Sequence, residues 1–410
     1  MAKYNYDKKA LAGLGVGAFL GEVKLREQHI EAAKAVMPEY DFNPNRVSAK
    51  LHPHVQFGVI TKAVSTEQAT TFTIQADKEM GCEKLAYFRA GQYIAFALEF
   101  GGAYMCKPYT LSSAPKSALG EDSSYEVTIQ RKADGYASTY ILDNWKVGSK
   151  VICSGPLGNF YYQYLRDSKN VVALAGGSGI TPFMSMAGAI ADGTEDFNLT
   201  ILYGVRNPQS IILKDDLEAA ASKSNGKVKV VYVYSDEGVA AEGAETGFIT
   251  AELIKKYAPD DYSIYVCGPK AMYAFAESEI AKLNLPKRKV RFELSGEYGD
   301  PTGDAAYPAD AAGKTYNVTV VIRGEEQVIT CAADETLLHA CESAGIRVQS
   351  DCRSGKCGWC HSRLISGDVY IPEKSDGRRA ADKKFGWIHP CSTYPVSDVK
   401  MEVFPINPAK

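Results

Sequence analysis

The sequence predicts a multi-domain protein with a short helical N-terminal extension, an antiparallel β-barrel, an α/β domain with a parallel sheet, and a smaller cysteine-containing domain. Residues 52–164 form short alternating strands separated by turn residues, a pattern typical of antiparallel barrels. From Lys169 onward, near-continuous apolar runs alternate with helical segments, which indicates a parallel sheet covered on both faces. The final part of the chain places cysteines at short, defined spacings.

Composition and length limit the possible functions. A chain of 410 residues is long enough for about two to four domains, each with its own core. A net charge of −3 gives no basic surplus for nucleic acid, and no apolar run approaches the roughly 20 residues of a membrane span. Six of the ten cysteines are scattered, mostly among apolar neighbours, and are interpreted as buried thiols in a reducing, cytoplasmic compartment: Cys82, Cys106, Cys153, Cys267, Cys331 and Cys341.

Residues 1–50 stand apart from the rest. The run from Ala10 to Gly21 resembles a signal peptide, but it is rich in glycine and no clear cleavage site follows it. Residues 21–38 have the spacing of an amphipathic helix that ends at Pro38. Two interpretations remain open, a helical extension packed on the body and a docking element for a partner.

Four cysteines near the C-terminus have the spacing of a plant-type [2Fe–2S] site. Cys352, Cys357 and Cys360 form C-x4-C-x2-C, and Cys391 follows later in the chain. The intervening glycines and serine allow the loop to wrap a cluster with amide N–H groups directed at its sulfurs. A zinc site would more usually show two C-x2-C pairs, and a disulfide frame is typical of small secreted chains.

The region from Lys314 to about Val403 resembles a plant-type ferredoxin domain. The resemblance rests on the cysteine motif, on expected strands at 316–322 and 327–331, and on an expected helix at 336–345. It implies an α+β domain of the β-grasp type over residues 314–410. His361 directly follows Cys360 and could suggest a Rieske ligand, but four cysteines already complete the cluster, so it is expected to have a packing or surface role.

Three motifs inside the predicted barrel resemble the flavin-binding domain of the ferredoxin–NADP reductase superfamily. They are K-P-Y-T-L-S-S at 107–113, G-Y-A-S at 135–138 and G-P-L-G at 155–158. The resemblance implies FAD, with FMN as the alternative, and a catalytic role for Thr110 near flavin N5. The cofactor-binding residues implied by it are Lys107, Pro108, Tyr109, Thr110, Ser112, Gly135 and Ser138. Lys107 departs from the family's arginine, and lysine lacks the planar fork that grips phosphate.

Two turns in the α/β region predict a dinucleotide site. The glycine-rich turn at 176–182 joins a strand to a helix, where the backbone can approach a pyrophosphate. Together with C-G-P at 267–269 it resembles the nicotinamide-flanking turns of the same superfamily. The resemblance implies cofactor contacts from Gly176, Gly177, Gly179, Thr181, Pro182, Gly268 and Pro269, and catalytic roles for Cys267 and Glu293. For Glu293, a rim carboxylate without a role is the alternative.

The strand that ends at Ser235 favours NADH over NADPH. Asp236 and Glu237 follow it, and carboxylates repel a 2′-phosphate and can accept hydrogen bonds from a ribose 2′-hydroxyl. NADPH-using relatives tend to have an arginine here. Arg206 is expected to contact the diphosphate or adenine side of the cofactor.

The expected domains are 1–50, the flavin barrel 51–166, the NAD(P) domain 167–295, a linker 296–313 rich in Gly, Pro, Ala and Asp, and 314–410. The basic loop 372–386 is expected to be a solvated face, with an acidic partner as the alternative.

The domain order resembles reductases of the phthalate dioxygenase reductase type. This resemblance implies an enzyme that passes electrons from NADH through flavin and a [2Fe–2S] cluster, singly, to a protein acceptor such as an oxygenase, demethylase or hydroxylase component. Two alternatives remain, an electron carrier or partner-binding module that does not oxidise NADH, and a direct reductase of a small molecule.

Overall fold

The computed structural model describes residues 15–32, 53–132, 135–236, 238–239, 242–293 and 296–404. Contacts divide the chain into residues 1–49 and residues 50–410. In the first unit, helix α2 (Val16–Ala32) begins five residues before the expected helix, and its side chains from Leu20 onward are exposed. Residues 33–38 of the expected helix lie outside the described residues. None of the described helices is both long enough and apolar enough to cross a membrane.

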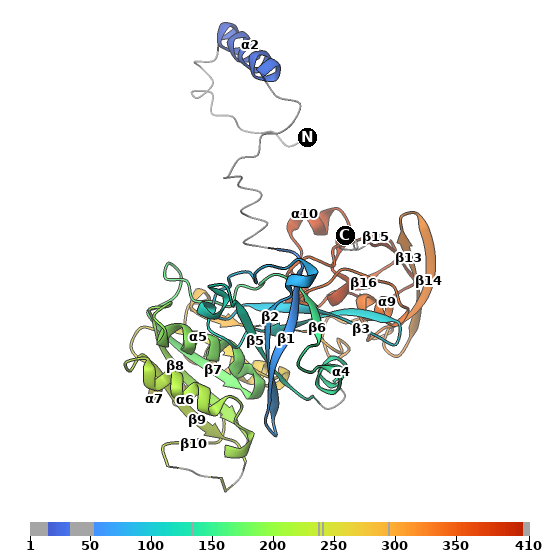
Figure 1. The fold of residues 1–410 in the computed structure, drawn as a ribbon. Coiled ribbons are helices and arrows are strands. Elements are labelled where there is room, and N and C mark those ends of the chain that lie inside the picture. Colours follow the sequence, from blue (N-terminus) through green and yellow to red (C-terminus); the bar gives the residue numbers. More distant parts are fainter. Residues whose placement is uncertain are drawn as a thin grey trace. The chain divides into compact units, whose positions relative to one another are not determined.

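The first domain of the second unit is a curled antiparallel sheet with the strand order β4-β3-β6-β1-β2-β5 (Figure 1). Its ends meet where Leu111, just after β4, bridges to Val127 of β5. Phe72, Phe96 and Tyr125 fill the interior. The predicted barrel is confirmed. Its elements are β1 (Gln56–Ser65), β2 (Ala69–Ala76), β3 (Tyr93–Phe100), β4 (Ala103–Thr110), β5 (Ser124–Gln130), β6 (Lys150–Cys153) and α4 (Tyr136–Asn144).

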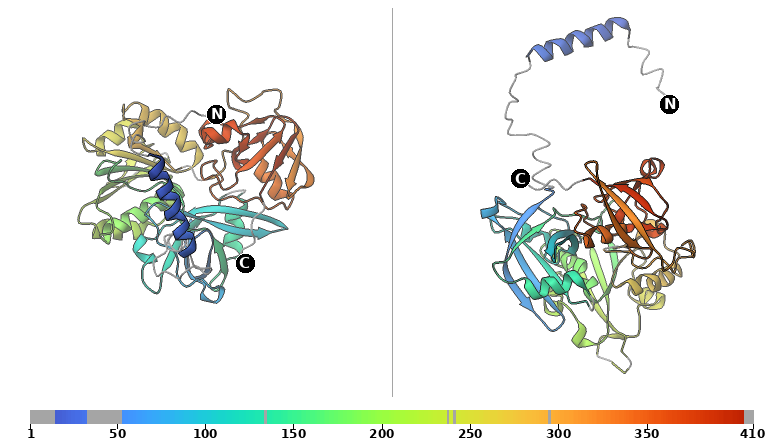
Figure 2. Two further views of the ribbon diagram at one scale, coloured as in Figure 1. Left: turned by 90° about the horizontal axis from the view of Figure 1, so that it is seen from above. Right: turned by 90° about the vertical axis from the view of Figure 1, so that its right-hand side faces the viewer.

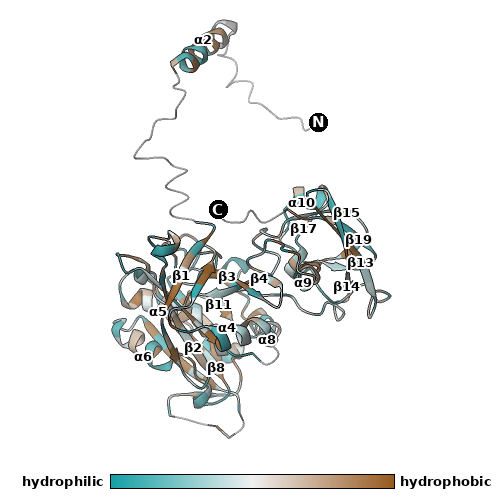
Figure 3. Cartoon of the chain, turned by 45° about the vertical axis from the view of Figure 1, so that its right-hand side comes forward, coloured by the Kyte–Doolittle hydropathy of each residue, from teal (hydrophilic) through white to brown (hydrophobic). Residues whose placement is uncertain are grey.

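The second domain is a parallel sheet with the order β10-β9-β8-β7-β11-β12. Alternate residues of β7 face opposite cores: Ala173 packs in the core with α5 and α6, whereas Leu174 packs in the core with α7 and α8. The strands of this sheet are rich in buried apolar residues, as expected for a sheet covered on both faces. Figure 3 colours the apolar residues of the chain brown. The strands are β7 (Asn170–Gly176), β8 (Asn198–Val205), β9 (Val228–Tyr234), β10 (Glu245–Thr246), β11 (Ser263–Cys267) and β12 (Val290–Phe292); the helices are α5 (Thr181–Ala191), α6 (Lys214–Lys223), α7 (Ala251–Tyr257) and α8 (Lys270–Ala281).

The third domain, drawn in orange to red in Figure 2, is a mixed sheet with the order β14-β13-β19-β15-β17. In it, β13 pairs in parallel with β19. Helix α9 packs its buried leucines into the same core as Cys360 and Cys391. This arrangement confirms the α+β prediction. The elements are β13 (Thr315–Ile322), β14 (Glu325–Ala332), β15 (Ser362–Ser366), β16 (Val369–Tyr370), β17 (Trp387–Ile388), β18 (Tyr394–Pro395), β19 (Val399–Glu402), α9 (Leu337–Ser343) and α10 (Ala380–Lys384).

The segment 296–313, expected to be a semi-flexible linker, is anchored in the structure. Tyr307 and Ala311 are buried, and the hydroxyl of Tyr307 donates to the carbonyl of Ala333 at 3.1 Å. The hydroxyls of Tyr298 and Tyr370 both donate to Asp304, at 2.7 and 2.9 Å. Glycine and proline content suggested flexibility, but the tyrosines tie the segment to the third domain.

Candidate functional site

The four cysteines expected to bind the cluster come together. The sulfurs of Cys360 and Cys391 are 3.3 Å apart, and the amides of Gly355 and Cys357 donate to the sulfurs of Cys391 (3.2 Å) and Cys352 (3.3 Å). The amide of Ser354 also donates to Cys352, at 3.4 Å. Such amide donors stabilise thiolate sulfur in iron–sulfur sites, so the residues present fit a cluster.

Glycine is required in this loop for backbone reasons. Gly355 has a φ of +74°, and a Cβ there would lie 2.0 Å from the carbonyl oxygen of Ser375. No three of the described His, Cys, Asp and Glu side chains are arranged to surround a single ion. The assignment of a two-iron cluster therefore depends on spacing, the shape of the loop and the amide donors. His361 stacks on Trp387 at 4.2 Å, which confirms the packing role expected for it.

The predicted flavin motif lies on β4, an edge strand of the curled sheet. An edge position tolerates Pro108, which has no N–H to donate, and it leaves the strand open to a ligand. Tyr109 is half-buried, and Thr110 pairs in register with Tyr93 of β3. The hydroxyl of Ser112 is used within the protein, since it donates to the carbonyl of Glu126 at 3.2 Å.

The second part of the predicted flavin site is the beginning of α4. Gly135 precedes the helix, and Ser138 in its first turn donates to the carbonyl of Gly135 at 3.3 Å. A Cβ on Gly135 would lie 2.7 Å from the Ser138 oxygen, so this turn needs glycine. The N-terminus of a helix suits an anion such as a flavin phosphate, so the residues present fit the cofactor.

Lys107 has a partner that its place in the flavin motif did not indicate. Its Nζ lies 3.6 Å from the carboxylate of Glu297, in the segment that leads to the third domain. Burial lowers the pKa of Lys107, and the charge of Glu297 opposes that shift. In the cluster loop of the third domain, Arg353 also contacts Glu297, through Nε at 2.6 Å.

The two turns expected to flank the nicotinamide meet in space. β7 and β11 are neighbours at the point where strand order reverses, which is where ligands bind in open parallel sheets. A Cβ on Gly176 would lie 2.9 Å from Pro269, and one on Gly179 would lie 2.2 Å from the carbonyl oxygen of Cys267. Backbone therefore contacts backbone here, as a dinucleotide cradle requires. Gly177 has a φ of +51°, and Thr181 and Pro182 begin α5, whose N-terminus follows this turn.

The residues expected to choose between NADH and NADPH lie at the ends of neighbouring strands. The amide of Asp236 donates to the carbonyl of Arg206 at 3.0 Å, and the Asp236 carboxylate accepts from the side chain of Asn207 at 2.8 Å. Asp236 and Arg206 are both exposed. Glu237 lies outside the described residues. An exposed carboxylate at this edge is able to accept from a ribose hydroxyl.

Glu293 and Cys267 form a buried group beyond the nicotinamide turns. The amide of Glu293 donates to the carbonyl of Val266 at 2.9 Å, and the hydroxyl of Tyr273 donates to the Glu293 carbonyl. Burial raises the pKa of Glu293 to about 8, and burial also raises the pKa of the Cys267 thiol. At neutral pH, Glu293 is therefore a neutral carboxylic acid that can donate a hydrogen bond.

The raised pKa of Glu293 predicts a pH dependence of stability. The pKa of Glu293 is higher in the folded than in the unfolded protein. Its contribution to the free energy of unfolding is therefore fully present below about pH 4.5 and is lost as pH rises through about 8. Between pH 6 and 8 we expect unfolding free energy to fall by on the order of 2 kcal/mol more than in Glu293→Gln. Urea unfolding of both proteins at the two pH values measures this. Equal pH slopes would show that Glu293 titrates normally.

Tyr93, which the sequence reasoning missed, lies between the predicted sites. It is buried, pairs with Thr110 across the strands, and packs against Gly158, where a Cβ would lie 2.9 Å from its ring. Burial raises its pKa, and the nearby Cys352 and Cys357 raise it further. The sequence did not indicate that Tyr93 lies between the sites. Its neighbours Cys352 and Cys357 come from the third domain, far away in the sequence.

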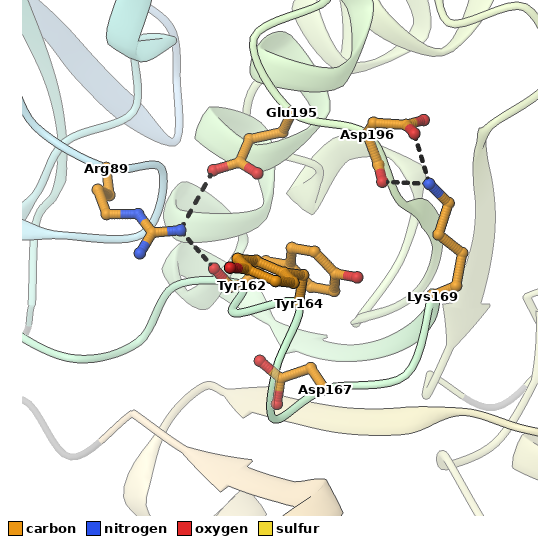
Figure 4. A pocket seen from close by; sticks show the side chains of 7 residues that line it. All are labelled: Arg89, Tyr162, Tyr164, Asp167, Lys169, Glu195 and Asp196. Atoms are coloured by element: carbon orange, nitrogen blue, oxygen red, sulfur yellow. Dashed lines mark hydrogen bonds and ion pairs between the residues drawn. The ribbon is translucent and has the colours of Figure 1, made fainter.

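A polar hollow lies away from these motifs, between the flavin barrel and the nucleotide domain (Figure 4). Arg89 donates to the carbonyl of Tyr162 at 2.6 Å and lies 3.7 Å from Glu195, and Lys169 pairs with Asp196. None of the predicted cofactor residues lines this hollow. The pair of Arg89 and Glu195 joins the two domains, so the hollow is interpreted as part of their interface.

Comparison with protein-family models defines the class of protein. Three models match in this order: an oxidoreductase FAD-binding domain over residues 57–162, an oxidoreductase NAD-binding domain over 173–278, and a 2Fe-2S iron-sulfur cluster binding domain over 320–396. The fold and the three sites therefore define an NAD(P)H oxidoreductase that contains FAD and a [2Fe–2S] cluster.

Relatives and solved structures agree with this class. The chain is 30% identical over 329 residues to the 3-ketosteroid-9-alpha-monooxygenase ferredoxin reductase component of Mycobacterium tuberculosis, covering 78% of this chain and 86% of the relative. It is 26% identical over 387 residues to the glycine betaine monooxygenase reductase subunit of Chromohalobacter salexigens, covering 89% of this chain and 100% of that one. The fold matches phthalate dioxygenase reductase with a TM-score of 0.58 at 22% identity, over 86% of this chain and 98% of that one.

The chain belongs to the family of oxygenase reductase components that carry an FAD-binding, an NAD-binding and a [2Fe–2S] domain in this order.

Proposed function

We propose that this protein oxidises NADH and delivers the electrons singly to the oxygenase component of a multi-protein oxygenase. The relatives named above are reductase components of monooxygenases, which supports an oxygenase as the acceptor. The observation that carries the proposal is that the cluster loop contacts the strand of the flavin motif: Arg353, next to Cys352, donates to the carbonyl of Cys106, next to Lys107, at 3.4 Å.

The site residues are proposed to hold three groups. Lys107 to Thr110, Ser112, Gly135 and Ser138 would hold FAD; the turns at 176–182 and 267–269, with Arg206 and Asp236, would hold NADH; and Cys352, Cys357, Cys360 and Cys391 would hold the cluster. When bound, the flavin takes a hydride from reduced nicotinamide and gives up electrons one at a time, which the cluster carries.

The chain's own residues orient and shield this chemistry. The close backbone contact between Gly179 and Cys267 holds together the two turns against which the nicotinamide would lie. Thr110 and the protonated Glu293 are proposed to donate hydrogen bonds near the reacting atoms. Cys357 is exposed whereas the other three cysteines are buried, so the cluster would approach the surface at Cys357, where an acceptor could dock.

The proposed domain limits are 1–50, 51–166, 167–295, 296–313 and 314–410. The separation of residues 1–49 from 50–410 supports the first limit. Because segment 296–313 is anchored to the third domain, we propose that residues 296–313 and 314–410 form one structural unit.

A one-electron protein probe tests this function. We expect the holoenzyme to oxidise NADH rapidly only when an electron acceptor is present, and to reduce oxidised cytochrome c through the cluster. An organic small molecule that sustains NADH oxidation without any added protein would instead favour the direct-reductase alternative. The artificial oxidant ferricyanide does not distinguish the two, because it accepts electrons directly from flavin. An absence of NADH oxidation under all conditions would favour an electron carrier.

The choice of coenzyme is proposed to depend on Asp236. We expect Asp236→Arg to shift the ratio of kcat/KM for NADH over NADPH toward NADPH by about tenfold to a hundredfold, because one charge-assisted hydrogen bond contributes about 1.5–3 kcal/mol. Steady-state assays with both coenzymes measure the ratio. Asp260→Arg, at an exposed position in the loop before the N-terminal end of β11, is the matched control. An unchanged ratio in Asp236→Arg would remove Asp236 from coenzyme selection.

A further inference from the structure

Four charged side chains meet between the flavin strand and the cluster loop, and we name this group the charge joint: Lys107, Glu297, Arg353 and Glu342. Arg353 holds Glu342 through two bonds, Nη1 to Oε1 at 2.6 Å and Nη2 to Oε2 at 2.7 Å. It holds Glu297 through Nε at 2.6 Å and Nη2 at 2.5 Å. Glu297 in turn lies 3.6 Å from Lys107.

The charge joint connects segments that are far apart in the sequence. Lys107 is in β4, Glu297 is in the anchored segment, Arg353 is in the cluster loop and Glu342 is in α9, which packs beside β4. Arg353 also donates to the carbonyl of Cys106. The φ of Arg353 is +54°, a left-handed backbone conformation that residues other than glycine rarely adopt. The loop is therefore held in a specific shape at the residue after Cys352.

Burial makes this group sensitive to the loss of any member. The side chains of Arg353 and Glu342 are 0% and 1% exposed, and two positive charges balance two negative ones. Buried ion pairs give little net stability compared with apolar packing, but removing one partner leaves an uncompensated buried charge. Burial alone would raise the pKa of Glu297, yet Arg353 and Lys107 lower it to about 2.

An exposed ion pair joins the same two domains and provides a contrast. Arg347, after α9, lies 3.3 Å from Glu99 of β3, and the two side chains are 56% and 65% exposed. Exposed pairs of this kind contribute little because water screens them. The charge joint is therefore the polar contact suited to hold the cluster loop in position.

We propose that the charge joint is a positioning device for electron transfer from flavin to cluster: Glu297 bridges Lys107 and Arg353 so that Cys352 stays at a fixed distance from the flavin strand. This inference rests on the proposed function. The step concerned moves single electrons, so that the flavin is oxidised and the cluster is reduced, and NADH supplies the electrons. Glu297, Arg353 and Glu342 are positioning residues and take no part in hydride transfer.

A lysine at position 107 agrees with this role. A lysine ammonium is a point charge without a fork, and here it lies beside the Glu297 oxygen that Arg353 also contacts. The Glu297 carboxylate thus contacts two cations, and the Glu342 carboxylate accepts two hydrogen bonds from Arg353. These contacts hold the cluster loop against β4.

The test is anaerobic stopped-flow reduction of the holoenzyme by NADH, in which the flavin and cluster absorbances separate the two steps. In Glu297→Gln we expect cluster reduction to slow about tenfold or more, because small displacements have large effects on a positioned reaction. Flavin reduction should stay within about twofold of the parent, since hydride transfer does not use Glu297. Glu99→Gln, the same chemical change at the exposed bridge, should leave both steps unchanged.

Three outcomes would overturn the inference: an unchanged cluster step in Glu297→Gln, an equal slowing of both steps, or a protein that no longer holds its cluster by EPR after dithionite reduction. The last would make the joint a requirement for assembly. Failure of the parent itself to reduce its flavin with NADH would instead contradict the proposed function. Glu297→Asp, which keeps the charge, should recover part of the lost rate.

Discussion

Replacing Cys391 with serine is expected to remove the [2Fe–2S] cluster and leave the flavin reaction intact. Cys391 is 1% exposed, its sulfur is 3.3 Å from that of Cys360, and it accepts the amide of Gly355. A hydroxyl is a poor replacement for a thiolate on iron, so one iron would lose a ligand. We expect iron content to fall from about two per chain toward zero, together with the loss of the reduced-cluster EPR signal.

The kinetic consequence separates the two cofactors. Reduction of cytochrome c by NADH should fall to background, while reduction of ferricyanide, which accepts electrons directly from flavin, should persist. Cys341→Ala is the control, because Cys341 is fully buried in the same core but is not one of the four predicted ligands. A Cys391→Ser protein that retains iron and cytochrome c reduction would show that the cluster has another fourth ligand.

The second large effect is expected at Gly179. A Cβ there would lie 2.2 Å from the oxygen and 2.4 Å from the carbon of the Cys267 carbonyl, and both are backbone atoms that cannot rotate away. Gly179→Ala should push the two nicotinamide turns apart at a cost of about 1–3 kcal/mol in folding free energy. We expect NADH-dependent flavin reduction to fall about a hundredfold, because a displacement near 1 Å has that effect on an oriented reaction.

Dithionite reduction should be unaffected in Gly179→Ala, since it does not use the nucleotide site. Gly204→Ala is the matched control: it lies in the neighbouring strand β8, and its nearest contacts, Ala175 and Ile249, would be at an ordinary 3.5 Å. Rapid-mixing measurements with NADH compare the three proteins. A normal rate in Gly179→Ala would mean that the nicotinamide does not depend on this contact.

Much of the fold follows from local patterns. The parallel sheet was predictable because buried strands such as β7 are apolar on both faces, and the ferredoxin domain was predictable because its ligands are close in sequence. The glycine-rich turn at 176–182 was also recognisable in the sequence, and its contact with a dinucleotide stays a prediction. The reason each glycine is needed, such as the approach of Gly179 to Cys267, required the structure.

The connections between domains were not predictable. Glu297 was interpreted as part of a semi-flexible linker, and nothing in the sequence indicated a role for Arg353. Their roles arise from tertiary contacts across large sequence separations, as with Arg353 and the carbonyl of Cys106. Secondary-structure propensity and hydrophobic periodicity depend only on residues close in the sequence. A charged residue that pairs with a distant segment therefore cannot be distinguished in the sequence from a solvent-exposed one.

The central claim is a continuous electron path from nicotinamide through flavin to the cluster. Anaerobic titration of the holoenzyme with NADH, followed by visible spectra and EPR, tests it most directly. The account predicts that NADH bleaches the flavin and produces the rhombic signal of a reduced [2Fe–2S] cluster, and that NADPH does so less effectively. An EPR signal raised by dithionite but by neither nucleotide would contradict the path.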